Sequence, residues 1–185
     1  MSTPLLFSTI EVTRQVFYRT SLSYAIVNLK PIVPGHVLVV PCRPVPRLAD
    51  LTTPELTSLI SSVQNVGRVI ERVYSGDALT IACQDGKAAG QSIPHVHFHI
   101  LPRRFQGDFF SGRNDDVYPA LERAEGSLPR DFQSSGQGGS PGHEPLKVDA
   151  DENRPPRTLE EMEKEATWLR NFFGPDNSGS AEFKN

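Results

Sequence analysis

Apolar residues in this sequence gather into short runs that are separated by turn residues. The runs cover residues 16–18, 22–27, 36–40, 78–83 and 93–101. Runs of this length that are rich in Val, Ile and aromatic residues are typical of β-strands. The turn-forming segment 31–35 joins the second run to the third, and a short Pro/Gly connection favours antiparallel pairing. The pattern therefore predicts an antiparallel sheet of about five strands.

Two other segments have the spacing of three to four residues that marks a helix. Apolar residues recur at this spacing from Leu56 to Val73, and we expect this helix to have Thr53 as N-cap and Pro54 at its first position. A second helix is expected to begin at the capping-box pattern 158–161 and to end near Gly174. Its apolar stripe consists of Met162, Ala166, Leu169 and Phe173.

The stretch 126–157 shows no apolar period, and its segment 136–142 is of low complexity. Such a composition predicts a disordered insertion. The whole pattern predicts one α+β domain, with the antiparallel sheet, two main helices and this insertion. The expected boundaries are a main domain over 1–125, the insertion over 126–157, a C-terminal helix over 158–174 that packs on the main domain, and a flexible tail over 175–185.

Composition argues against several classes of protein. No apolar run reaches about 18 residues, so no membrane span is expected. Residues 1–10 lack the basic region and apolar core of a secretory signal. The net charge of −3 argues against non-specific nucleic-acid binding. Residues 1–113 nevertheless hold 11 Lys and Arg against 7 Asp and Glu, which is the balance that a site for anionic phosphates prefers.

Three histidines alternate with apolar residues in the last predicted strand. His95, His97 and His99 share one face of such a strand, and the residues between them face the core. A neutral imidazole is a nucleophile near pH 7, and an imidazolium can donate a proton to a leaving group. The pattern therefore predicts a catalytic row of imidazoles.

A metal site is the main alternative for these histidines, because His is a common zinc ligand. The sequence has no CxxC or HExxH motif, and no carboxylate stands on the same strand. We therefore expect no dedicated metal site. His36 follows Pro34-Gly35 at the start of another strand, and we expect it to support the catalytic histidines.

Residues 95–101 resemble the signature of the histidine triad (HIT) family, in which three histidines alternate with apolar residues. The segments 28–36, 84–86, 90–92 and 101–103 flank the signature and are similar to the Fhit branch of dinucleoside polyphosphate hydrolases. The resemblance covers about residues 7–123 and 158–173. It implies the HIT fold and cleavage of diadenosine triphosphate to AMP and ADP through a nucleotidyl-histidine. Cleavage of diadenosine tetraphosphate to AMP and ATP is an alternative, and so is a nucleotide-binding signalling module with slow turnover.

The resemblance also implies a role for each histidine. His97 is expected to attack the α-phosphorus as the nucleophile, and His99 to hydrogen-bond phosphate oxygens near the scissile bond. His95 and His36 are expected to orient and polarise the site. The presence of His99 separates the chain from the nucleotidylyltransferase branch, which replaces the third histidine.

The substrate-binding residues are implied in the same way. Asn28 matches a ribose-binding Asn, and Gln84 matches a substrate-binding Gln. The phosphate contacts are expected from the Gln91 amide and from the backbone N–H groups of Gly90, Gln91, Ser92 and Ile93. Gln84 and Gln91 also argue against the phosphoramidase branch of the family.

Cofactors and partners follow from the same resemblance. We expect a divalent cation, Mg²⁺ or Mn²⁺, to accompany the substrate phosphates, and we expect no tightly bound cofactor. The chain is expected to form a homodimer and to bind neither nucleic acid nor membrane. Its expected location is the cytoplasm, with the nucleus as a second compartment.

Overall fold

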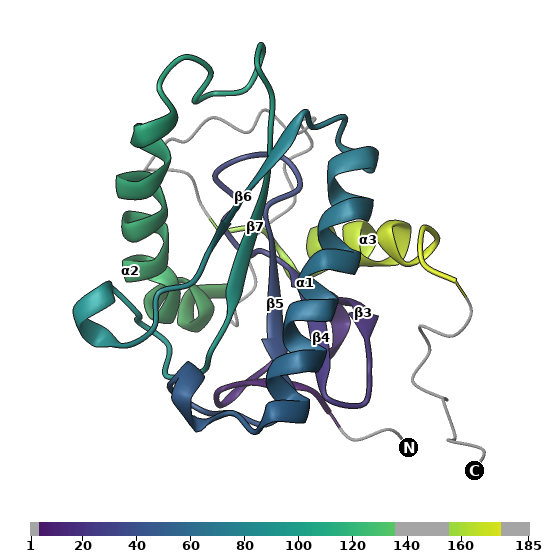
Figure 1. Ribbon diagram of the computed structural model, residues 1–185, viewed down its shortest axis with the longest axis vertical. Coiled ribbons are helices and arrows are strands. Elements are labelled where there is room, and N and C mark those ends of the chain that lie inside the picture. Colours follow the sequence, from purple (N-terminus) through teal and green to yellow (C-terminus); the bar gives the residue numbers. More distant parts are fainter. Residues whose placement is uncertain (1–3, 136–155, 175–185) are drawn as a thin grey trace.

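The computed structural model describes residues 4–135 and 156–174, with side chains up to residue 132 in the first range. An antiparallel five-stranded sheet lies at its centre, in the order β3-β4-β5-β7-β6 (Figure 1). Its strands are β3 Val16–Arg19, β4 Ser23–Val27, β5 Val37–Pro41, β6 Ala78–Ala82 and β7 Phe98–Arg103. The predicted antiparallel sheet is therefore confirmed. A two-stranded hairpin, β1 Leu6–Phe7 and β2 Ile10–Glu11, precedes it and had no counterpart in the prediction.

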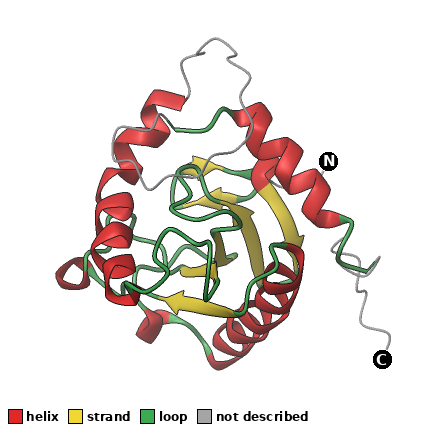
Figure 2. Ribbon diagram, turned by 90° about the horizontal axis from the view of Figure 1, so that it is seen from above, coloured by secondary structure: helices red, strands yellow, loops and turns green. Residues whose placement is uncertain are grey.

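Helices cover both faces of this sheet (Figure 2). The described residues form α1 Thr53–Val73, α2 Val117–Ser135 and α3 Leu159–Arg170. Residues of α1 and α3 share one apolar cluster with the β-strands, whereas Leu128 and Phe132 of α2 pack with the β1–β2 hairpin in another. Because neighbouring residues of a strand face opposite sides, Val39 joins the first cluster and Leu38 the second. None of the described helices is long and apolar enough to cross a membrane.

The first residues of α1 and α3 explain where these helices begin. Thr158 caps α3 in a reciprocal capping box with Glu161, as predicted. The N-cap of α1 is Thr52 and not Thr53, because Thr52 and Glu55 form the reciprocal pair there. The helix α3 ends at Arg170, which is earlier than the predicted end near Gly174.

The predicted disordered insertion over 126–157 is wrong for residues 126–135, and α2 is a helix beyond the two main helices that the pattern predicted. Residues 126–135 belong to the helix α2, and Leu128 is buried. Gly126 and Pro129 concealed this helix, because both residues are poor helix formers. Arg157 is also ordered and buried. Residues 136–155 and the predicted tail 175–185 lie outside the described residues.

Candidate active site

The histidine segment enters the sheet later than predicted. The strand β7 begins at Phe98, so His95 and His97 precede it and only His99 lies in the ladder. Pro94 has no N–H to donate, and Val96 N–H bonds the Val45 carbonyl outside the ladder. The expected alternation of faces nevertheless survives, because the apolar residues between the histidines all contact the cluster under α1.

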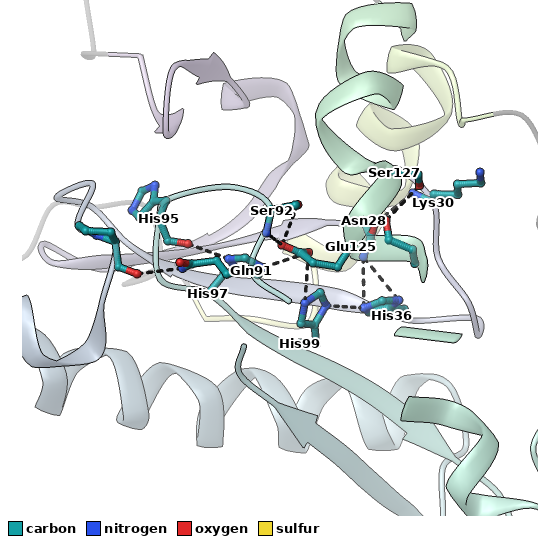
Figure 3. A network of polar contacts seen from close by, with 12 residues as sticks. Asn28, Lys30, His36, Gln91, Ser92, His95, His97, His99, Glu125 and Ser127 are labelled. Atoms are coloured by element: carbon teal, nitrogen blue, oxygen red, sulfur yellow. Dashed lines mark hydrogen bonds and ion pairs between the residues drawn. The ribbon is translucent and has the colours of Figure 1, made fainter. Parts of the chain in front are cut away.

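His97 is held in one orientation by the backbone. Its Nδ1 lies 2.7 Å from the carbonyl oxygen of His95, which can only accept, so Nδ1–H is the donor. The other ring nitrogen, Nε2, lies 3.2 Å from Oε2 of Glu125 (Figure 3). This orientation directs Nε2 toward a fixed position for an anionic oxygen.

His36 and His99 form a hydrogen-bonded pair behind the position for an anionic oxygen that His97 faces. The backbone N–H of Ile32 donates to Nδ1 of His36 over 3.3 Å, which leaves the proton of His36 on Nε2. That Nε2–H donates to Nδ1 of His99 over 2.9 Å. His99 therefore carries its own proton on Nε2, which is buried and lies 3.6 Å from Oε2 of Glu125. The pair presents a second N–H donor to the same anionic oxygen.

His95 lies apart from this position and uses both ring nitrogens for the fold. Nε2–H donates to the Pro41 carbonyl over 2.9 Å, and Nδ1 accepts from Ser8 N–H over 2.9 Å. Burial lowers the pKa of His95 to about 4, so the ring is neutral at pH 7. Its link to the site is its carbonyl oxygen, which holds His97.

Glu125, from α2, is the site residue that the sequence interpretation missed. Its side chain is 1% exposed and stands between the histidines and the loop before them. Ser92 donates to Oε1 through its backbone N–H, over 3.2 Å, and through Oγ, over 3.0 Å. The spacing of Val117, Leu121 and Leu128 is helical and could have revealed α2. No local pattern could have shown that α2 crosses the histidines.

The pKa directions in this cluster follow from burial and from Glu125. Burial alone favours neutral histidines, and it lowers the pKa of His36 and of His99. For His97 the hydrogen bond and charge of Glu125 outweigh burial, so its pKa is raised. The pKa of Glu125 is lowered, because the hydrogen bond from His97 and the nearby ring of His99 outweigh its own burial. Nδ1 of His97 faces a carbonyl oxygen and Nε2 faces a carboxylate, so both ring nitrogens lie against acceptors, and this arrangement favours the protonated ring.

The structure brings some of the predicted binding residues to the histidines. Asn28 is buried, and its Nδ2 lies 3.1 Å from Nε2 of His36. Ser92 reaches the same carboxylate as His97. Ile93 is buried in the cluster that contains the β1–β2 hairpin. Ser92 is thus linked to His97 through Glu125, whereas Asn28 lies beside His36 with its Nδ2 against the donor Nε2 of that ring.

Gln84, Gly90 and Gln91 form the edge of the site. Gly90 has φ of +90°, and a Cβ there would lie 2.7 Å from Nε2 of Gln84. Glycine at this position therefore allows Gln84 to lie against the loop. Oε1 of Gln84 is buried without a hydrogen-bond partner in the described part of the chain. The Gln91 amide donates to the Pro46 carbonyl over 2.9 Å.

Arg157 connects the segment before α3 to Asn28. Its Nε donates to the carbonyl oxygen of Asn28 over 3.1 Å, and its Nη2 donates to the same oxygen. Its Nη1 pairs with Glu165 of α3, which also accepts from the hydroxyl of Tyr74. This buried guanidinium lay within the predicted insertion and was not expected at the site.

Three potential metal ligands meet within the described residues. One nitrogen each of His97 and His99 and one oxygen of Glu125 lie within 4.8 Å of one another. The sequence offered no carboxylate on the histidine strand, and α2 supplies one from outside it. Since this set contains the predicted nucleophile, a metal ion bound there would occupy the electron pair that attacks phosphorus.

The sheet order and the paired histidines define the class of protein. The family model for the HIT domain matches residues 9–106, which is more than half of the chain. The chain belongs to the HIT family, as the histidine signature predicted.

Individual relatives extend this similarity beyond the domain. The chain is 51% identical to the bis(5'-nucleosyl)-tetraphosphatase [asymmetrical] of Schizosaccharomyces pombe, over 95% of this chain and 98% of that protein. It is 44% identical to the bifunctional bis(5'-adenosyl)-triphosphatase/adenylylsulfatase FHIT of Arabidopsis thaliana, over 86% and 78%. Among solved structures, the NitFhit protein of C. elegans matches 94% of this chain and 31% of its own, with 34% identity and a TM-score of 0.65.

Proposed function

We propose that this protein hydrolyses dinucleoside polyphosphates, with diadenosine triphosphate cleaved to AMP and ADP. The observation that carries the proposal is the His97 ring, whose Nδ1 is fixed on a carbonyl while Nε2 faces an anion position. The relatives agree on hydrolysis of this substrate class, and the A. thaliana protein is named a triphosphatase. The chain is accordingly a hydrolase of phosphoanhydride bonds.

The chemistry proceeds in two displacements at the α-phosphorus. Nε2 of His97, once deprotonated, forms a bond to phosphorus, and the bond to the bridging oxygen breaks, which releases ADP. Water then attacks the same phosphorus, the N–P bond breaks, and AMP leaves. The donors Ser92 N–H, Ser92 Oγ–H and His99 Nε2–H stabilise the charge that develops on the phosphate oxygens. Asn28, Gln84 and Gln91 remain the predicted contacts to the rest of the substrate.

Diadenosine tetraphosphate is the second candidate substrate, with AMP and ATP as products. The 51% identity to the S. pombe tetraphosphatase over nearly its whole length favours this candidate. Product analysis by chromatography, with the triphosphate and the tetraphosphate side by side, decides between them. ADP as the faster product supports the first substrate, and ATP as the faster product supports the second.

The mechanism is tested at His97. We expect His97→Ala to lower the turnover number by about 1,000-fold or more and to retain substrate binding. An acid-labile AMP adduct, trapped in the wild type and located by peptide mass spectrometry, should lie on His97. Wild-type turnover in the variant, or an adduct on His95 or His99, contradicts the assignment.

We further propose that Mg²⁺ or Mn²⁺ reaches the site with the substrate phosphates and not on dedicated ligands. The support is chemical, because a divalent cation neutralises the polyphosphate chain that the site must receive. Turnover should then rise with the concentration of the metal–substrate complex. Binding of the cation to the substrate-free protein should be weak by calorimetry, and tight binding there contradicts the proposal.

We propose that the chain forms a homodimer and that the exposed edge of the sheet, at β6, is its interface. Among the described strands, β6 pairs with β7 alone, and Ile81 on it is 47% exposed. Leu56 and Ile60 of α1 are also exposed, and exposed apolar residues and a free strand edge are both typical of an interface. We expect Ile81→Lys to yield a monomer in sedimentation analysis, whereas Phe105→Ser, on another exposed residue, leaves the dimer intact. A monomeric wild type contradicts this proposal.

A further inference from the structure

The Glu125 carboxylate occupies the position of an anion in the site. Its two oxygens accept from Ser92 N–H and Oγ–H and from His97, and one of them also faces Nε2 of His99. The proposed function assigns the Ser92 and His99 donors to the oxygens of the substrate phosphate and His97 to its phosphorus. An oxygen of a carboxylate and an oxygen of a phosphate are alike in charge and in accepting hydrogen bonds. The donors can serve only one of them at a time.

We propose that Glu125 is an intramolecular competitor that phosphate ligands must displace, so that it weakens the binding of each of them and favours release of the mononucleotide product. The inference rests on the proposed function, because it takes the histidine site as the phosphate site. The competitor also covers the nucleophile, since Nε2 of His97 points at the Glu125 carboxylate while that carboxylate is bound. When the substrate displaces Glu125, its phosphorus comes to Nε2 of His97, and the proton held there passes to water before the electron pair attacks.

The helix α2 is built to release Glu125 at low cost. Pro129 stands four residues after Glu125 and has no N–H, so the carbonyl of Glu125 lacks its usual helical partner. Gly126 follows directly, and glycine weakens a helix further. The helix is therefore weakest at the turn that carries the competing carboxylate. The apolar contacts of Val117, Leu121 and Leu128 anchor it on either side.

Competition of this kind acts on ligands according to whether they carry a phosphate at the histidines. It weakens every such ligand by the same factor, because all of them must displace the same group. AMP has few other contacts and leaves, whereas a dinucleoside polyphosphate has a second nucleoside and further phosphates with which to bind. Adenosine has no phosphate and does not meet Glu125. Glu125 thus favours release of the product at the cost of a higher KM for the substrate.

The test measures binding of AMP, inorganic phosphate and adenosine to the full chain by calorimetry, with a chelator present. Glu125→Ala empties the position, and Glu125→Gln keeps the volume and removes the charge. The matched control is Glu122→Gln, an exposed residue about one turn earlier on the same helix. We expect AMP and phosphate to bind about 10-fold more tightly to both Glu125 variants, because a charge-assisted contact no longer has to be broken. The affinity for adenosine, and all affinities of the control, should stay at wild-type values.

The proposal is overturned if AMP and phosphate bind to the Glu125 variants as they do to the wild type or more weakly. It is also overturned if adenosine gains as much affinity as AMP. If Glu125→Ala does not fold, as judged by thermal melting, Glu125→Gln gives the answer alone. These binding results do not depend on turnover. A wild type that releases no nucleotide from either dinucleotide contradicts the proposed function. If the wild type is active but the Glu125 variants bind AMP with unchanged affinity, only the proposal that Glu125 competes with phosphate is contradicted.

Discussion

Replacement of Arg157 by Met should destabilise the protein strongly, although Arg157 lies far along the chain from the catalytic histidines. The guanidinium is buried and donates twice to the carbonyl oxygen of Asn28 and once to Glu165. Met preserves much of the side-chain volume, so the loss is mainly of these polar contacts. The variant leaves a buried carbonyl without its donors and a largely buried carboxylate without its cation.

The magnitude follows from these two groups. An orphaned buried acceptor costs about 1–3 kcal/mol, and removing one partner of a buried ion pair costs about 3–5 kcal/mol. Tyr74 still donates to Glu165, which offsets part of the second cost. We therefore expect Arg157→Met to lower the free energy of unfolding by about 4 kcal/mol, the lower end of the combined range and a large share of the roughly 5–15 kcal/mol of a typical domain.

Urea denaturation at pH 7, followed by circular dichroism, measures this change. Adding Glu165→Gln to Arg157→Met should recover part of the loss, since no unpaired carboxylate then remains. The matched control is Arg14→Met, which breaks an exposed ion pair with Glu163 of the same helix and should have no measurable effect. A cost below about 1 kcal/mol for Arg157→Met would refute the reasoning, because buried partners would then tolerate its loss.

Three further predictions concern pH, capping and the loop. The pKa of His95 is about 4 in the folded chain and 6.5 in the unfolded chain, so the unfolded chain takes up the proton first as the pH falls. The free energy of unfolding should therefore drop by about 3 kcal/mol between pH 6.5 and 4. A urea midpoint that stays constant over this range contradicts the prediction. Thr52→Ala removes the N-cap of α1 and should cost about 1 kcal/mol in the same assay, and no change would mean that the cap is dispensable. Gly90→Ala places a Cβ at a positive φ and against the Gln84 amide, whereas Gly107→Ala places one at a positive φ with no atom nearby. The first variant should therefore raise KM and the second should not. Equal KM values would contradict the role of the loop.

The local pattern of apolar residues was sufficient to predict the sheet and two of the three described α-helices. The strands near 22–27, 36–40 and 78–83 and the helix α1 appear within a few residues of their predicted positions, because each depends on a short apolar period. The same holds for the histidine signature, whose alternation places its apolar residues in the core even though β7 begins at Phe98. Periodicity within one segment carries this information, and no distant contact is needed to find it.

The role of each histidine, by contrast, depends on contacts with residues far away in the sequence. The ring of His95 bonds Ser8, which is 87 residues away, and so belongs to the fold instead of the anion position. The histidine pair His36 and His99 joins residues that are 63 positions apart. A sequence pattern reports only which face a side chain takes, whereas the partner of each ring nitrogen is set by which strands pair.

What the sequence by itself determined is therefore the α+β class, the antiparallel sheet, the capped helices α1 and α3, and the histidine row with its family. Only the tertiary structure decided that Glu125 of α2 faces His97 and that Arg157 holds Asn28. The physical reason is the range of the interactions. Glu125 and His97 are 28 residues apart and Arg157 and Asn28 are 129 apart, so their contacts form only when packed elements bring them together.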